Sequence, residues 1–226
     1  MKYLCIETMK IIELKIWTDD LAGTERFYSR QLGFQKQDKN SEEVSYQVGT
    51  TRLSFQASSD TQPNYHIAFN IASNQIEDAL DWIRGRVSLI EIPDGELIVD
   101  FTGWKAKSFY FWDNNGNILE FIARSGLQIN NTPPFDPSHI LSVSEIGLPV
   151  DHVGDISAWL QKEYGLPVFS RQEPKENFIA LGDDEGLLLL VPEGRNWYPT
   201  NHPSVKSGTK MRVMQGSRVF DLSFTS

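Results

Sequence analysis

The sequence predicts an α+β protein in which paired βαβββ units form a curved, cup-like mixed sheet. Residues 10–57 and 63–123 repeat one order: an apolar strand, an amphipathic helix, then short strands. The closing strands of these repeats align as Leu53-Ser-Phe-Gln-Ala57 and Leu119-Glu-Phe-Ile-Ala123. A unit of this kind cannot bury its apolar face alone, so we expect the first two units to share one sheet. A third, incomplete βαβββ module follows from residue 143.

The first unit begins with an apolar strand at residues 11–17. Apolar residues at helical spacing then predict a helix over 21–32, with Asp19 or Asp20 capping its first amides. Gly33 supplies the left-handed residue that ends such a helix. Polar turns separate the three closing strands, which we expect at residues 34–39, 44–48 and 52–57.

The second unit repeats this order with one long insertion. Its first strand is expected at 65–71 and its helix at 74–86. The stretch 91–105 is longer than its counterpart in the first unit, and its aromatics Phe101 and Trp104 indicate a loop that covers a cavity mouth. An Asn-Gly turn then joins two hairpin strands, at residues 107–112 and 117–123.

Turn-forming residues divide the chain into two segments. We predict a two-unit module over 1–127, a linker over 128–140 and a partial second module over 141–226. The partial module has its first strand at 143–150, its helix at 155–164, closing strands at 178–181 and 187–191, and one more strand at 210–214. An incomplete sheet leaves a strand edge unpaired, which favours a homodimer.

Composition limits the classes of partner. A net charge of -9 and a pI of about 4.9, without a basic cluster, argue against nucleic acid. No apolar run approaches the roughly 20 residues of a membrane span, and we find no secretory leader, so we expect a cytoplasmic protein without a membrane partner. The single cysteine, Cys5, cannot form an internal disulfide.

Three motifs resemble the vicinal oxygen chelate superfamily, which includes glyoxalase I, fosfomycin resistance proteins, bleomycin-binding proteins and extradiol ring-cleaving dioxygenases. The match is dense over 10–124 and looser over 143–191. The motifs are Glu13 followed by Asp20-Leu21, Phe27-Tyr28 and Leu32-Gly33-Phe34, then Tyr65-His66-Ile-Ala-Phe69, and finally Phe109-Tyr-Phe-Trp-Asp-Asn-Asn-Gly-Asn-Ile-Leu-Glu120.

The resemblance implies a metal site at Glu13, His66 and Glu120, with a divalent Fe, Mn, Ni or Zn ion as cofactor. Glu13 departs from the histidine or glutamine that is usual in the family. Two carboxylates and one imidazole still suit these ions. We expect Glu13 and Glu120 to be the catalytic residues as well, with Glu13 acting as a base.

Each predicted ligand also has a simpler structural explanation. His66 alone reads as a hydrogen-bonded core histidine. Glu120 lies between apolar residues on a half-buried strand, so its carboxylate needs a metal, a proton or a salt bridge to Lys15 or Arg52. Glu13 could instead pair with Lys15 or be buried in its neutral form. For Glu145, at the equivalent position of the third unit, we expect a structural role.

Two functions follow from this pattern. The first is a metal-dependent enzyme of lyase, isomerase or ring-cleaving dioxygenase type, which chelates two oxygens of a small organic substrate. The second is a metal-free protein that binds or sequesters a small molecule, as bleomycin-binding relatives do. The substrate itself cannot be read from the chain, since one fold serves many reactions.

Overall fold

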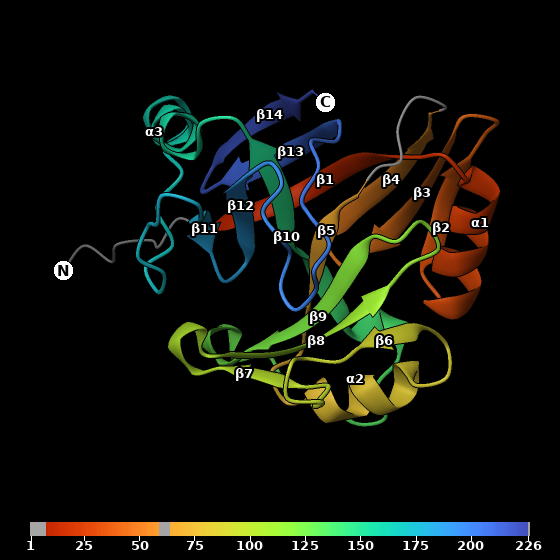
Figure 1. The fold of residues 1–226 in the computed structure, drawn as a ribbon. Coiled ribbons are helices and arrows are strands. Elements are labelled where there is room, and N and C mark those ends of the chain that lie inside the picture. The colour runs from red at the N-terminus through yellow and green to blue at the C-terminus, as the bar shows by residue number, and fades with distance from the viewer. Residues whose placement is uncertain (1–7, 59–63, 226) are drawn as a thin grey trace.

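The computed structural model describes residues 8–58 and 64–225 and contains two mixed β-sheets (Figure 1). Cys5 lies outside the described residues. The first sheet has six strands, in the order β14 (Arg218–Phe224), β13 (Thr209–Gln215), β1 (Met9–Thr18), β4 (Thr51–Ala57), β3 (Glu43–Val48) and β2 (Gln35–Lys39).

The second sheet has eight strands. Its order is β11 (Ile179–Asp183), β12 (Gly186–Pro192), β10 (Ile140–Val150), β5 (His66–Ile71), β9 (Ile118–Arg124), β8 (Ala106–Trp112) and β6 (Ser88–Ile90), with β7 (Val99–Phe101) also paired to β8. The α+β class and the βαβββ fold predicted from the sequence are confirmed for the first two units, and the third, incomplete unit stays an interpretation.

The units pair differently from the expectation. The first unit, β1 to β4, is extended along β1 by the hairpin of β13 and β14. The second unit, β5 to β9, shares its sheet with the third unit, because β5 pairs antiparallel with β10. The first two units therefore do not form one cup. The apolar faces of the repeats predict that units pair, but they do not specify which units become partners.

Three helices complete the units, and each lies close to its predicted position. Helix α1 (Leu21–Arg26) begins at Asp20, whose carboxylate accepts the Gly23 amide at 2.8 Å, and it continues as a π-helix over Phe27–Gln31. Helix α2 (Ile76–Ile83) is shorter than expected and packs on β8 and β9. Helix α3 (Val153–Tyr164) ends at Gly165, which has a φ of 73°.

A shared hydrophobic core lies between the two sheets. Ile67 and Phe69 of β5 belong to the same buried cluster as Leu14 and Ile16 of β1. Because side chains alternate along a strand, the residues between them point away from this core. Each sheet therefore offers one face to the core and the other to a separate cavity.

The C-terminal segment contains more structure than the sequence indicated. The sequence predicts a strand at 210–214, which is β13, and no strand after it, whereas β13 and β14 form a regular antiparallel hairpin. Strands of the two predicted modules also pair with each other, β1 with β13 and β5 with β10. The division of the chain into two modules at residues 128–140 therefore stays a prediction. None of the helices in the described ranges is long and apolar enough to cross a membrane.

Candidate metal centre

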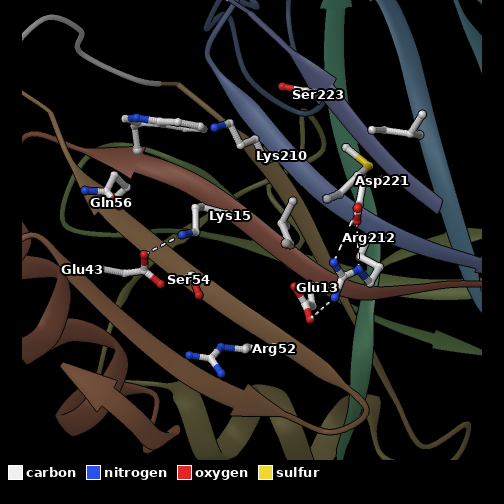
Figure 2. A pocket seen from close by; sticks show the side chains of 14 residues that line it. Glu13, Lys15, Glu43, Arg52, Ser54, Gln56, Lys210, Arg212, Asp221 and Ser223 are labelled. Carbon is white, nitrogen blue, oxygen red and sulfur yellow. Dashed lines mark hydrogen bonds and ion pairs between the residues drawn. The ribbon is translucent and has the colours of Figure 1, made fainter. Parts of the chain in front are cut away.

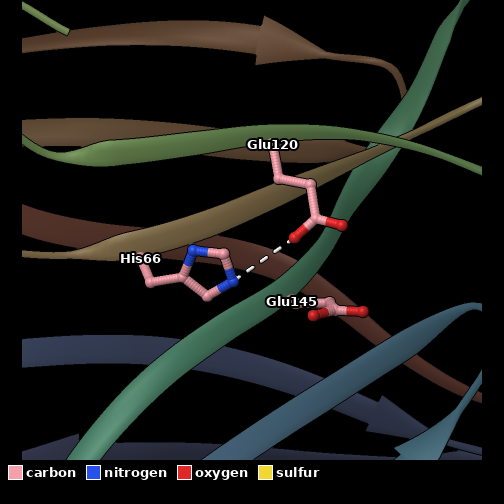
Figure 3. Close-up of side chains that lie close together, drawn as sticks. All are labelled: His66, Glu120 and Glu145. Carbon is pink, nitrogen blue, oxygen red and sulfur yellow. Dashed lines mark ion pairs between the residues drawn. The ribbon is translucent and has the colours of Figure 1, made fainter. Parts of the chain in front are cut away.

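His66, Glu120 and Glu145 converge inside the second sheet (Figure 3). One ligand atom from each residue lies within 4.8 Å of those of the other two, and His66 Nε2 is 3.4 Å from Glu120 Oε2. All three side chains are buried. Two carboxylates and an imidazole, brought together away from water, form the arrangement that holds a divalent cation in many proteins.

The strand register explains how the three side chains meet. Strands β9 and β10 lie on either side of β5, and Ala68 of β5 is paired with Glu120 on one side and Glu145 on the other. The small Ala68 side chain leaves space between the carboxylates. The pairing of β10 with β5 shifts register between Val143 and Glu145, and such an irregularity re-aims the side chain that follows it.

A buried ion-pair network borders the three residues. Arg124, which is fully buried, forms an ion pair with Glu145, and its Nη1 lies 3.7 Å from Asp184 Oδ1. Asp184 in turn accepts a hydrogen bond from Arg171 Nη2 at 2.8 Å. Burial raises the pKa of Glu145 to about 7; the nearby charge of Glu120 acts in the same direction, and Arg124 opposes it.

Glu120 is the carboxylate that this network leaves without a lysine or arginine partner among the described residues. The sequence analysis named Lys15 and Arg52 as possible salt-bridge partners of Glu120. Both pair with other carboxylates: Lys15 binds Glu43 at 2.6 Å, and Arg52 binds Asp38 at 2.8 Å. The nearest charge partner of Glu120 is the imidazole of His66. A buried carboxylate in this position favours a cation or a proton beside it.

Glu13 does not join His66 and Glu120, so the predicted three-residue site is wrong. Glu13 lies on the outer face of the first sheet, in a different cavity of about 660 Å³ (Figure 2). Its side chain is 49% exposed and binds Arg212 Nη1 at 3.1 Å. The physical reason is the pairing of the units, since β1 and β5 belong to different sheets that pack back to back.

Glu145 takes the place that the sequence assigned to Glu13. Its position in the third unit corresponds to that of Glu13 in the first, and residues 187–191 of its own unit contain no acid to complete a site. The partner acid comes instead from the second unit. The sequence signal that could have identified Glu145 as a site residue was its position, which is equivalent to that of Glu13. That signal becomes useful only when the second and third units are taken to pair.

A cavity of about 570 Å³ opens above the three residues. Phe101 and Trp104 line it, as predicted for the long loop of the second unit, and Tyr110 does too. Trp197, which the sequence analysis did not single out, is buried with its ring centroid 5.2 Å from that of His66. Burial raises the pKa of Tyr110 well above its ordinary value, so its hydroxyl stays protonated.

The residues present fit a divalent cation. Ligand atoms bound to one ion at about 2.0 to 2.2 Å lie up to about 4.4 Å apart, so the spacing of 4.8 Å requires only small side-chain rotations. The buried Nδ1 of His66 has no hydrogen-bond partner in the described part of the chain. The fourth position of the cup, on β12, is Leu189, which also lines the cavity and is not a ligand. Three protein ligands would leave coordination positions open to substrate.

Of the comparisons with known proteins, only the one with solved structures found similar folds. No family model matches the chain, and no curated protein does either. Among solved structures, a "putative dioxygenase" from Bacillus subtilis is 13% identical, with a TM-score of 0.60 over 96% of this chain and 85% of that one. A glyoxalase I mutant from Zea mays is 12% identical, with a TM-score of 0.55 over 96% of this chain and 93% of that one.

A further glyoxalase I structure from Zea mays is 14% identical, with a TM-score of 0.55 over 88% of this chain and 71% of that one. Identities this low speak for the fold and leave the reaction open. The structural similarity extends over 88 to 96% of this chain. The chain therefore has the vicinal oxygen chelate fold of these glyoxalase and dioxygenase structures, as its sequence motifs predicted.

Proposed function

We propose that the chain is a metal-dependent enzyme that acts on a small oxygen-bearing organic molecule in the cavity of the second sheet. His66, Glu120 and Glu145 would hold the ion, with Fe, Mn, Ni and Zn as the candidates. The observation that carries this proposal is the convergence of the three buried side chains at the base of an aromatic-lined cavity. The reaction would be of lyase, isomerase or ring-cleaving dioxygenase type.

The chain's own residues have distinct tasks in this proposal. When bound, the ion supplies Lewis-acid polarisation of adjacent substrate oxygens. Arg124 positions Glu145 through their ion pair. Glu120 retains the proton-transfer role predicted for it, because it lines the cavity; Glu13 cannot share that role, because it lies in the other cavity. Aromatic side chains around the cavity exclude water from the substrate.

Metal uptake by purified protein tests this proposal. After removal of metal with a chelator, the protein is incubated separately with Mn(II), Fe(II), Ni(II) and Zn(II), and the bound metal is measured by mass spectrometry. We expect one ion per chain for at least one metal, with a rise in melting temperature because the ion binds only the folded state.

Matched variants locate the ion. Glu120→Gln and Glu145→Gln each remove one carboxylate with little change of shape, and we expect either to abolish uptake. Glu13→Gln makes the same chemical change in the other cavity, and we expect uptake to be retained. Failure of the wild-type protein to take up any of the four ions, or equal uptake by Glu120→Gln, rejects the metal-enzyme proposal.

A metal-free binding protein is the second candidate, and one observation favours it. Arg124 already supplies Glu145 with a buried cation, so part of the negative charge of the cluster is neutralised without a metal. A proton on His66 would give Glu120 an ion-pair partner at 3.4 Å. In that case the cavity would sequester a small aromatic molecule, and ligand binding would persist unchanged in chelator-treated protein.

A homodimer remains part of the proposal. The third unit lacks one strand of the βαβββ pattern, which leaves β11 at the edge of the second sheet. Exposed edge strands are commonly covered by another chain. Light scattering after size-exclusion chromatography tests the assembly, and a mass equal to one chain of 25.7 kDa at high concentration would reject it.

A further inference from the structure

Two cations at one end of the cavity in the second sheet lack an acidic partner. Arg195 and Lys175 both line this cavity, and neither forms a salt bridge with any residue that the structure describes. The side chain of Arg195 makes one hydrogen bond, from Nη1 to the Asn196 carbonyl at 3.3 Å. Burial lowers the pKa of Arg195, as expected for a half-buried guanidinium with no carboxylate beside it.

Both cationic residues adjoin Phe178, Arg195 through the ring and Lys175 through the backbone. The guanidinium of Arg195 lies 5.2 Å from the centroid of Phe178. Lys175 is tied to Phe178 by two backbone hydrogen bonds, of 2.9 and 3.1 Å. Phe178 therefore marks a positively charged end of the cavity. In a chain with 30 acidic and 21 basic residues, two cations that line one cavity without an acidic partner are suited to bind an anion from outside.

The cavity between the two ends is lined by flat side chains. The rings of Phe101 and Tyr198 are 5.8 Å apart, and Tyr198 is 5.9 Å from Tyr110, whose ring is 6.3 Å from that of His66. Such walls bind planar apolar groups by stacking and edge contacts. These contacts connect the metal-centre residues to the cavity wall.

An unused hydrogen-bond donor lies at the metal-centre end. Trp197 is 3% exposed, lines the cavity, and has no hydrogen-bond partner for its indole Nε1 in the described residues. A buried indole N–H without an acceptor costs free energy unless a ligand supplies one. This end of the cavity therefore favours a ligand that carries oxygen atoms, in addition to any that a metal would bind.

We propose that this cavity binds a small planar organic acid, with its carboxylate at Arg195 and Lys175, its ring between the aromatic walls, and its oxygen-bearing edge at Trp197, His66 and Glu120. The placement of the oxygens on a metal rests on the proposed function, whereas the carboxylate contact does not. The cations also give an anionic substrate a favourable path into a protein whose net charge of -9 repels it.

Three probe molecules separate these contacts. Benzoate has the ring and the carboxylate, catechol has the ring and two adjacent oxygens, and a dihydroxybenzoate with adjacent hydroxyls has all of them. Binding is measured by ligand-observed NMR titration against chelator-treated and metal-loaded protein. The variants are Arg195→Gln and Lys175→Gln, with Arg84→Gln as a matched loss of an exposed arginine on a different surface.

We expect Arg195→Gln to weaken benzoate and dihydroxybenzoate binding by about tenfold or more, since a charge-assisted hydrogen bond is lost, and to leave catechol binding unchanged. Lys175→Gln should act in the same direction to a smaller extent, because its ammonium is more exposed. Arg84→Gln should match the wild type for all three probes.

The inference and the proposed function fail in different ways. No benzoate binding by the wild-type protein, or equal benzoate affinity in Arg195→Gln, overturns the organic-acid inference even if metal is bound. Metal-free protein that binds benzoate through Arg195 but takes up no ion supports the inference and rejects the metal enzyme. Metal-dependent tightening of catechol and dihydroxybenzoate, but not of benzoate, supports both.

Discussion

Arg124 forms an ion pair with Glu145 across strand β5, and both side chains are buried. The guanidinium also lies near Asp184, so one buried cation serves two carboxylates that come from different parts of the third unit. Buried charges of this kind are tolerated only as a set, because removal of one member leaves the others without compensation in a medium of low polarity. This network is therefore the most sensitive point near the cavity.

Replacement of the buried cation should destabilise the fold strongly. We expect Arg124→Leu to lower the free energy of unfolding by about 3 to 5 kcal/mol, because Glu145 is left buried without a partner. Urea unfolding followed by circular dichroism measures the change. Arg124→Lys, which keeps the charge but loses the planar fork, should lose less. Equal stability of Arg124→Leu and the wild type would show that the ion pair is not formed as described.

The ion pair between Glu13 and Arg212 in the other cavity should contribute far less to the stability of the fold. Glu13 is half exposed and binds Arg212, which is also exposed. Surface ion pairs contribute roughly 0 to 1 kcal/mol, so Glu13→Gln should leave the urea midpoint nearly unchanged. The same variant serves as the control in the metal-uptake experiment. A loss as large as that of Arg124→Leu would mean that the first cavity is more enclosed in solution than its exposure indicates.

Gly147 gives Trp197 the space it occupies beside His66. A Cβ atom added at Gly147 would lie 2.4 Å from Trp197 Cη2, well inside the contact distance. Gly147→Ala should therefore displace the indole, cost about 1 to 3 kcal/mol, and change the near-ultraviolet circular dichroism of the tryptophans. Gly154→Ala, on α3 with no atom near the added methyl group, should be neutral or slightly stabilising. Indistinguishable spectra for the wild type and Gly147→Ala would contradict this packing.

Tyr28 links the first unit to the hairpin of the second. Its buried hydroxyl donates a hydrogen bond to Asp113 Oδ2 at 2.9 Å, and Asp113 accepts further bonds from the amides of Asn115 and Asn117. Tyr28→Phe should cost about 1 to 3 kcal/mol, because the carboxylate loses one of its buried donors. Thermal unfolding measures the loss, and Tyr164→Phe, on a half-buried ring of α3, is the control. A smaller loss for Tyr28→Phe than for the control would rule out this role.

Glu25 should give a distinct pH dependence of stability. Hydrogen bonds from Lys36 and then Lys39 lower its pKa from 4.5 to about 2. Because the folded value lies below the unfolded one, the stabilisation is present above pH 4.5 and is lost as the pH falls towards about 2. Glu25→Gln should thus melt below the wild type near neutral pH and match it at about pH 2. The two lysines are exposed, so added salt should reduce the difference. A difference that persists in strong acid would contradict this assignment.

Local features of the sequence were sufficient to predict the secondary structure and part of the site. Alternation of apolar residues located β1 and β5, and the predicted caps Asp20 and Gly33 marked the two ends of the first helix. The family resemblance placed His66 and Glu120 on the inner face of one cup, and the two side chains do meet there. The prediction differed for α2, which begins at Ile76 and ends at Ile83, the first and the last of its buried residues.

The sequence by itself determined the βαβββ units, their order and the inward face of each strand, because these depend on contacts between residues close in the chain. Only the tertiary structure decided that the second unit pairs with the third, and so that Glu145 rather than Glu13 completes the group with His66 and Glu120. The first strands of all three units are similarly apolar, so the choice of partner depends on how the two sheets pack around one core, a long-range property that no local pattern records.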